Sequence, residues 1–374
     1  MATVLTLSVF NGSIIGHGGE KRTEQIKDLV SSHFSHKHLV FPFDYHGKKQ
    51  ISFRNKISHS LSVSQARYAS EATRESFSID KILSESHKFH LQRKTLEQHR
   101  EIFTQASTVI WENNYDGFFY QPYLIKKMYG TKIIACPQNI ESLVPRTMTG
   151  WLGKTKLDYL KQDLEPFRVC DEVFTISEED QWLFNLLDIK AKYLPSFPAG
   201  DLFQQNLRLR ESRALTKQKD YFLILGTVGN PPTRSGMNRL LRDLQSLSGD
   251  GKYEFCVVGF GTEVLKDEFD VCKDIKIIGS VDQSQLELMM RECKAMIINQ
   301  DYCPGALTKV PEILISGIPV IMNTGASRSY KRMDGVFVYE TIVELLTFLN
   351  MEFTIPVAPL YPKERYKGFI DAIE

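Results

Sequence analysis

Residues 295–323 read AMIINQDYCPGALTKVPEILISGIPVIMN. The stretch begins and ends with short runs of Ile, Met and Val, at 295–300 and 319–323, which are typical of strands buried on both faces of a sheet. Between them, Gly317 followed by Pro319 predicts a helix end, and Pro311 fits a helix only in its first turn. Strand, loop, helix and strand in this order predict a parallel sheet with a crossover helix.

The same alternation of short apolar runs and longer helical patterns extends over most of the chain and predicts an α/β fold. Further strands are expected at 3–10, 38–43, 108–111, 132–136, 173–176, 221–226, 255–259 and 275–279. Helices are expected at 20–34, twice within 65–106, near 236–246 and at 282–293. A Pro- and Gly-bearing segment that becomes highly charged, 195–220, interrupts the alternation and predicts a junction between two domains.

Charge is balanced over the whole chain but not along it. Forty-six Lys and Arg residues face 45 Asp and Glu residues, which does not favour a nucleic-acid-binding protein. Residues 1–150 hold 19 basic and 13 acidic side chains, and all nine histidines lie between His17 and His99. The first part is therefore expected to carry a basic face, which either meets an anionic surface or is simply solvated.

Cysteines and the N-terminal residues give negative signals. The six cysteines are widely spaced, without a Cys-x-x-Cys pair or a histidine at zinc-finger spacing, so no metal site is predicted. The first residues, MATVLTLSVF, have neither the basic stretch nor the long apolar stretch of a signal peptide. No run in the sequence approaches the 18 apolar residues of a transmembrane helix. A cytoplasmic location without a transmembrane span is expected.

The segment after Cys303 has the residues of a phosphate site. The helix is expected to begin near Thr308 as its N-cap, with Lys309 in the first turn and Glu312 on the same face. Helix N–H groups and a lysine bind phosphate, a carboxylate can accept hydrogen bonds from ribose, and Gly305 lets backbone approach the ligand. A nucleoside diphosphate needs these groups; the other interpretation is an ordinary turn with a solvated Lys–Glu pair.

Several segments together resemble a known family. The spacing Gly305-x-x-x-Lys309-x-x-Glu312 is followed by SGIPV at 316–320. The other segments are FLILGTVGNPPTRSGMNRLLRDL (222–244), VVGFG (257–261), IIGSVDQSQLELMMRECKAMI (277–297), CPQNIESL (136–143) and CDEVFTISEEDQWLF (170–184). In order and spacing they resemble the retaining, family-four glycosyltransferases of GT-B fold.

The resemblance implies two Rossmann-like domains that face each other across a cleft. Residues 1–200 would form the acceptor side, 201–352 would hold a nucleotide-diphosphate sugar, UDP- or GDP-linked, and a tail helix within 353–374 would cross back. It implies transfer of the sugar to a glycan, lipid-linked or small-molecule acceptor with retention, without a metal or a permanently bound cofactor. The candidate catalytic residues are Lys309, Glu312 and Arg234; the candidate nucleotide-binding residues are Gly305, Thr308, Val281, Gly18, Gly19 and Asn230.

The chain departs from the family pattern at two positions. Pro304 stands eight residues before Glu312, where the commoner pattern has a first glutamate, although a subset of the family has the Gly/Lys/Glu form. Gln138 stands where many relatives have histidine. Two alternatives therefore remain: a nucleotide-sugar epimerase of similar double fold and a catalytically inert binding partner. A dinucleotide fingerprint in the first loop fails, because Lys21 occupies its third glycine position.

A basic helical region, 81–100, is the candidate surface for a peripheral contact with the inner face of a membrane. It interleaves basic residues with apolar ones, among them Arg93 and Lys94 beside Phe89 and Leu96. The same pattern is expected of any helix that covers a sheet, so both interpretations stay open.

Overall fold

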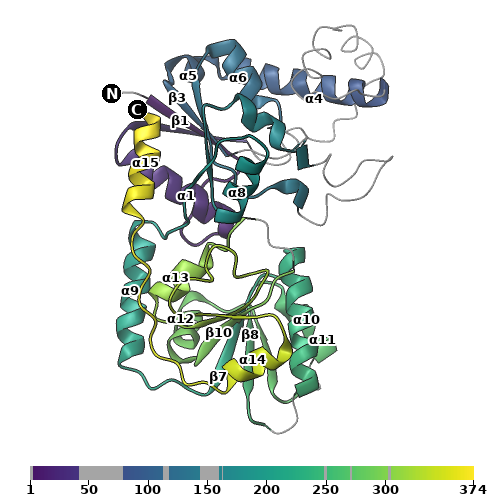
Figure 1. Cartoon of the computed structure of the whole chain (residues 1–374), viewed down its shortest axis with the longest axis vertical. Helices are drawn as coiled ribbons and strands as arrows, with labels where there is room; N and C mark the ends of the chain where they lie inside the picture. Colours follow the sequence, from purple (N-terminus) through teal and green to yellow (C-terminus); the bar gives the residue numbers. More distant parts are fainter. Residues whose placement is uncertain are drawn as a thin grey trace. The chain divides into compact units, whose positions relative to one another are not determined.

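The computed structural model describes residues 3–41, 79–112, 118–143, 160–161, 163–247, 251–269, 272–301 and 305–374, with the side chains of 79–87 excepted. The chain divides into two compact units (Figure 1). Unit 1 comprises Met1–Pro195 and Pro362–Glu374, and unit 2 comprises Ser196–Tyr361. Each unit contains one parallel sheet of six strands, so the fold is α/β with two Rossmann-like domains.

Unit 1 is built on the strand order β2-β1-β3-β4-β5-β6. Its strands are β1 (Thr3–Ser8), β2 (Ser35–Val40), β3 (Thr108–Trp111), β4 (Lys132–Ala135), β5 (Glu172–Thr175) and β6 (Lys192–Tyr193). Its helices are α1 (Gly18–Ser31), α4 (Ile79–Gln98), α5 (Arg100–Gln105), α6 (Gln121–Tyr129), α8 (Glu178–Leu186) and the C-terminal α15 (Lys363–Ile373), with short 3-10 turns at Glu141–Leu143 and Glu165–Val169.

Two elements of unit 1 differ from expectation. Strand β2 lies three residues earlier than the apolar run 38–43 predicted, because its polar first half is held by β1. His36 Nε2 lies 2.9 Å from Thr6 Oγ1, and His38 Nε2 lies 2.8 Å from Ser8 Oγ. Helix α1 begins at Gly18 instead of residue 20, because His17 forms a capping box one residue before it.

Unit 2 has the strand order β12-β11-β10-β7-β8-β9. Its strands are β7 (Tyr221–Leu225), β8 (Glu254–Val258), β9 (Ile275–Gly279), β10 (Ala295–Ile298), β11 (Val320–Asn323) and β12 (Val336–Tyr339). Its helices are α9 (Gly200–Ala214), α10 (Pro231–Leu247), α11 (Lys266–Phe269), α12 (Gln283–Glu292), α13 (Lys309–Ile315) and α14 (Ile342–Leu349), with a 3-10 turn at Thr262–Leu265.

The strands of unit 2 bury alternate side chains in two separate cores. Phe222 and Ile224 of β7 point to the core with α10, α11 and α14, whereas Tyr221 and Leu223 point to the core with α12 and α13. Figure 1 shows the sheet between these two layers of helices. Both faces are covered, which accounts for the nearly continuous apolar runs in the sequence.

The expected junction 195–220 is largely a helix. Helix α9 belongs to unit 2 and packs against α12 and α13. Its charged character is structural, because Arg213, 3% exposed, donates hydrogen bonds to the carbonyl oxygens of Met290, Arg291 and Cys293 at the end of α12. The same guanidinium bonds the carbonyls of Gly317 and Lys294. One buried arginine thus satisfies the carbonyl groups that two helix ends leave unpaired.

Replacing Arg213 with methionine should destabilise unit 2 strongly. We expect Arg213→Met to lower the free energy of unfolding by about 3 kcal/mol or more, because several buried carbonyls lose their donor together. Arg208→Met, on an exposed position of α9, is the matched control and should be nearly neutral. Calorimetric unfolding of both variants tests this, and equal melting temperatures would contradict it.

Candidate functional site

The strand order of unit 2 places a topological switch point beside β7. After β7 the chain adds β8 and β9 on one side of the sheet, and then β10, β11 and β12 on the other. The loops that follow β7 and β10 therefore leave in opposite directions and open a crevice at the carboxyl ends of the strands. In open α/β sheets this is the position where ligands bind.

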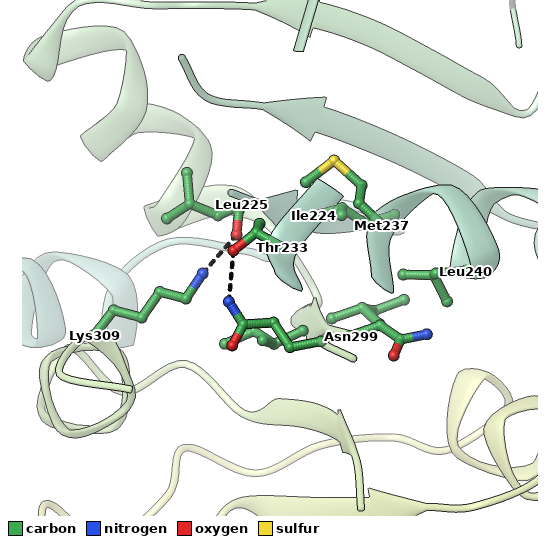
Figure 2. A pocket seen from close by; sticks show the side chains of 10 residues that line it. Ile224, Leu225, Thr233, Met237, Leu240, Asn299 and Lys309 are labelled. Carbon is green, nitrogen blue, oxygen red and sulfur yellow. Dashed lines mark hydrogen bonds between the residues drawn. The ribbon is translucent and has the colours of Figure 1, made fainter. Parts of the chain in front are cut away.

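A small cavity lies at that switch point. Its polar lining consists of Thr233, Asn299, Gln300 and Lys309, and the rest is apolar side chains of β7, α10 and β10. Figure 2 shows the side chain of Lys309 reaching from α13 to the end of β7, where its Nζ donates a hydrogen bond of 2.8 Å to the carbonyl of Leu225. Gln300 Nε2 donates to Thr233 Oγ1 over 2.5 Å.

Glycine makes this close assembly possible. A Cβ on Gly236 of α10 would lie 2.4 Å from the carbonyl oxygen of Asn299, so only glycine lets this helix approach the end of β10. Asn323, at the end of β11, holds the backbone of Gln300, the residue after Asn299. Its Oδ1 accepts from the Gln300 N–H at 3.0 Å, and its Nδ2 donates to the Gln300 carbonyl at 2.9 Å.

The residues predicted around Lys309 lie together on α13 and the loop before it. Gly305 has φ 72°, a conformation that favours glycine, and Glu312 is half-buried in the first turn. Thr308 occupies the N-cap position, as predicted, but its side chain makes no capping hydrogen bond. Its φ and ψ of −56° and −26° are helical, whereas a capping side chain requires extended backbone. Pro304 lies outside the described residues.

Arg234 and Asn230 are both exposed at the start of α10. The Arg234 N–H donates to the carbonyl of Asn230 at 2.9 Å, and the two positions between Asn230 and Thr233 are prolines, Pro231 and Pro232, which carry no N–H. The first turn of α10 therefore offers an anion fewer backbone donors than helices usually do. Cationic side chains must supply most of the attraction for a phosphate here.

Val281 is the second residue after β9 and is half-buried against the α12–α13 core. The strand before it ends at Gly279, whose φ is 95°. Ser280 is held in place, because its N–H donates to the carboxylate of Glu263 at 2.8 Å. This hydrogen bond also lowers the pKa of Glu263. The loops after β8 and β9 are therefore joined.

Gly18 and Gly19 belong to unit 1, whereas the residues that line the cavity belong to unit 2. They form the first turn of α1, where the Gly19 N–H donates to His17 Nδ1 at 3.1 Å. Gln138, the residue at the family's histidine position, donates from its Nε2 to the carbonyl of Gly19 at 3.2 Å and to Glu112 Oε2 at 3.3 Å. These residues lie at the switch point of unit 1, between the ends of β1 and β3.

Glu112 is the site residue of unit 1 that the sequence analysis missed. It is 1% exposed, accepts a 2.8 Å hydrogen bond from Thr23, and its Oε1 has no hydrogen-bond partner among the described residues. Burial raises the pKa of Glu112 to about 7, although Thr23, Gln138 and the positive charges of Arg22 and Lys27 oppose the shift. An acidic residue directly after the apolar run TVIW was the signal that could have identified it.

A second carboxyl group with a raised pKa follows the neighbouring strand. Burial, and then the negative charge of Asp163, raise the pKa of Glu141 to about 7. Asp163 itself accepts hydrogen bonds from the N–H and hydroxyl of Ser142, at 3.0 and 3.1 Å. Within the described part of the chain, no group of three His, Cys, Asp or Glu residues is arranged to hold a metal ion.

Comparisons with known proteins give the fold. The sequence matches no protein-family model and no curated protein. The structure is similar to the lipopolysaccharide outer core galactosyltransferase WaaB, with 14% identity, 99% of each chain covered and a TM-score of 0.58. It is also similar to Anabaena HepE in complex with UDP, with 11% identity, 94% of this chain and 89% of that one covered and a TM-score of 0.56.

A third similar structure is an epimerase. UDP-GlcNAc 2-epimerase from Methanocaldococcus jannaschii has 12% identity, covers 99% of each chain and has a TM-score of 0.52. A galactosyltransferase and an epimerase are thus both similar in fold to this chain. The GT-B fold implied by the sequence is confirmed.

The raised pKa of Glu112 predicts a pH-dependent stability. Between its ordinary value of 4.5 and about 7, the folded state binds more protons at this group than the unfolded state, so stability falls as the pH rises and levels off above about 7. We expect the wild type to lose up to roughly 3 kcal/mol relative to Glu112→Gln between pH 4.5 and pH 8. Denaturant unfolding of both proteins across this range measures it. Glu141 is present in both proteins, so its contribution cancels when their stabilities are subtracted. Parallel curves of stability against pH would contradict the prediction.

Proposed function

We propose that the chain is a glycosyltransferase that moves a sugar from a nucleotide-diphosphate sugar, UDP- or GDP-linked, to a glycan, lipid-linked or small-molecule acceptor. Unit 2 binds the donor at its switch point, and unit 1 serves the acceptor. The reaction proceeds with retention and without a metal or a permanently bound cofactor. Lys309 and Arg234 neutralise the charge that develops on the diphosphate leaving group.

The position of Lys309 is the observation that carries this proposal. Its ammonium group lies at the carboxyl end of β7, beside a cavity at the switch point of a Rossmann-like sheet. Because Pro231 and Pro232 remove backbone donors from the first turn of α10, the lysine is the best-placed group to hold a phosphate. Glu312, one helical turn along α13, is the carboxylate that we assign to the ribose hydroxyls.

Removing either side chain should impair use of the donor. We expect Lys309→Ala and Glu312→Ala each to weaken UDP binding and turnover about ten- to a hundredfold, the usual effect of losing a charge-assisted contact. Lys217→Ala, an exposed lysine of unit 2, is the matched control. Calorimetric titration with UDP and GDP measures the binding step. Wild-type affinity in both folded variants would remove these residues from the site.

The two alternatives give different products from the same assay. An epimerase converts a UDP-sugar into an altered UDP-sugar without an acceptor, whereas a transferase releases UDP only when the sugar leaves. An inert partner does neither; the proline at position 304, where the commoner family pattern has glutamate, is the feature that favours it. Incubation with UDP-glucose, UDP-galactose and UDP-N-acetylglucosamine, followed by chromatography of nucleotides and sugars, separates the three.

We also propose a cytoplasmic location with a peripheral contact between unit 1 and an anionic membrane surface. Arg93, Lys94 and Arg100 are exposed, and Arg93 forms an ion pair of 2.9 Å with Glu97 on the next turn. The apolar residues Phe89 and Leu96 are buried in the core of unit 1, so the contact of the described residues would be electrostatic. No helix in the described part of the chain is long and apolar enough to cross a bilayer.

Vesicle flotation tests the membrane contact. At low salt we expect binding to vesicles that contain phosphatidylglycerol, and the double change Arg93→Glu and Lys94→Glu should weaken it at least about tenfold, since each basic residue near the surface contributes about 1 kcal/mol. Lys190→Glu, an exposed change elsewhere in unit 1, is the control. If the wild type does not float with anionic vesicles, a soluble acceptor becomes the working hypothesis.

A further inference from the structure

An exposed aromatic side chain lies on the ligand-binding edge of unit 2. Phe260 is the second residue after β8 and is 73% exposed, and Val264, four residues later, is 59% exposed. The carboxyl ends of parallel strands all lie along one edge of the sheet, so Phe260 is on the same edge as Lys309 and the switch point. By contrast, the large apolar residues of β7, β8 and β10 are buried in the two cores or packed against them.

The loop that carries Phe260 is fixed on both sides. Gly259 and Gly261 have φ values of 139° and 79°, which side chains rarely adopt, so glycine at both positions sets the course of the loop. A Cβ on Gly259 would lie 1.9 Å from the carbonyl oxygen of Gly226, which shows how closely the loops after β7 and β8 approach. The carbonyl of Phe260 accepts a 3.0 Å hydrogen bond from the N–H of Val228.

The neighbouring loop is fixed to the same segment. Gly259 donates to the carbonyl of Gly279 at 3.0 Å, and Glu263 accepts from the Ser280 N–H at 2.8 Å. Phe260 is therefore anchored between the loop after β7, next to the diphosphate site proposed above, and the loop after β9, which carries Val281. Such anchoring presents the ring to a ligand at little entropic cost.

The geometry fits the length of a nucleotide. With the diphosphate at the switch point beside β7, the base can extend along this edge of the sheet past the end of β8 towards β9. Strands are about 5 Å apart, which puts the ends of β8 and β9 one and two spacings from β7.

We propose that Phe260 is the platform on which the nucleobase of the donor stacks, with Val264 beside it and the backbone of Val281 at the base edge. This inference rests on the proposed function, since it presumes a nucleotide at the unit 2 site. Stacking on an aromatic face tolerates any base, because every base has a π-face. Phe260 therefore contributes affinity, and choice between uracil and guanine falls to the groups around Val281.

Substitution of Phe260 distinguishes the contribution of the base to affinity from that of the phosphates. We expect Phe260→Ala to weaken UDP and GDP binding about tenfold, or about 1.4 kcal/mol, and to leave the affinity for inorganic pyrophosphate within twofold. Phe260→Trp should retain the affinity of the wild type. Val343→Ala, an exposed apolar residue on α14, is the matched control and should change neither ligand. Calorimetric titration measures all four proteins.

The tryptophan variant adds a direct readout. The three native tryptophans, Trp111, Trp151 and Trp182, all fall in the sequence of unit 1, so Phe260→Trp introduces the single tryptophan of unit 2. Its added fluorescence should be quenched by UDP but not by pyrophosphate or ribose 5-phosphate.

The outcomes distinguish this inference from the proposed function. If UDP binds the wild type and Lys309→Ala weakens it, but Phe260→Ala does not, the stacking role is wrong and the donor site stands. Equal losses for UDP and pyrophosphate in Phe260→Ala would also overturn it, because they indicate a disturbed loop. If neither UDP nor GDP binds the wild type, the proposed function fails, and the stacking role fails with it.

Discussion

Each sheet is covered by apolar side chains on both faces, and this burial determines where polar groups can lie. Phe222 and Ile224 enter one core of unit 2 while Tyr221 and Leu223 enter the other, so β7 has no face left for chemistry. Charged and hydrogen-bonding side chains must therefore gather where the strands end. The polar groups of Lys309, Gln300 and Glu112 all lie at such ends. In each unit the strand order determines the switch point, and the polar groups of that unit gather there.

Covering both faces also brings helix ends and crossing segments against apolar surface, where unpaired carbonyl groups are costly. Both units use a buried arginine for this. Arg213 of α9 bonds the carbonyls at the ends of α12 and α13. In unit 1, Arg22 of α1 is 0% exposed and donates to the carbonyls of Leu194 and Pro195, the last residues before the chain enters unit 2. These guanidinium groups stabilise backbone that secondary structure alone cannot satisfy.

The difference between apolar burial and polar pairing explains what could be predicted from the sequence. Strands such as β7, β10 and β11 were predictable because burial on both faces leaves continuous Val, Ile and Leu runs. Strand β2 and helix α9 were misplaced or missed because their His and Arg side chains are paired with groups that are distant in the sequence. The cluster around Lys309 was predicted from its spacing. A side-chain cap at Thr308 depends on backbone angles, and the burial of Glu112 depends on neighbours from α1 and from the loop after β4.

The two switch points differ in electrostatic character, and this difference bears on where a diphosphate can bind. In unit 2 the cation of Lys309 attracts an anion, whereas in unit 1 Glu112 presents a carboxyl that is partly ionised near pH 7. Gly19 was a candidate for contact with the diphosphate, yet its N–H is used by His17 and its carbonyl is linked through Gln138 to Glu112. A phosphate at Gly19 would lose a donor and meet a carboxylate, which favours the diphosphate site proposed in unit 2. A hydroxyl-bearing acceptor carries no such charge, and the environment of Glu112 is compatible with it.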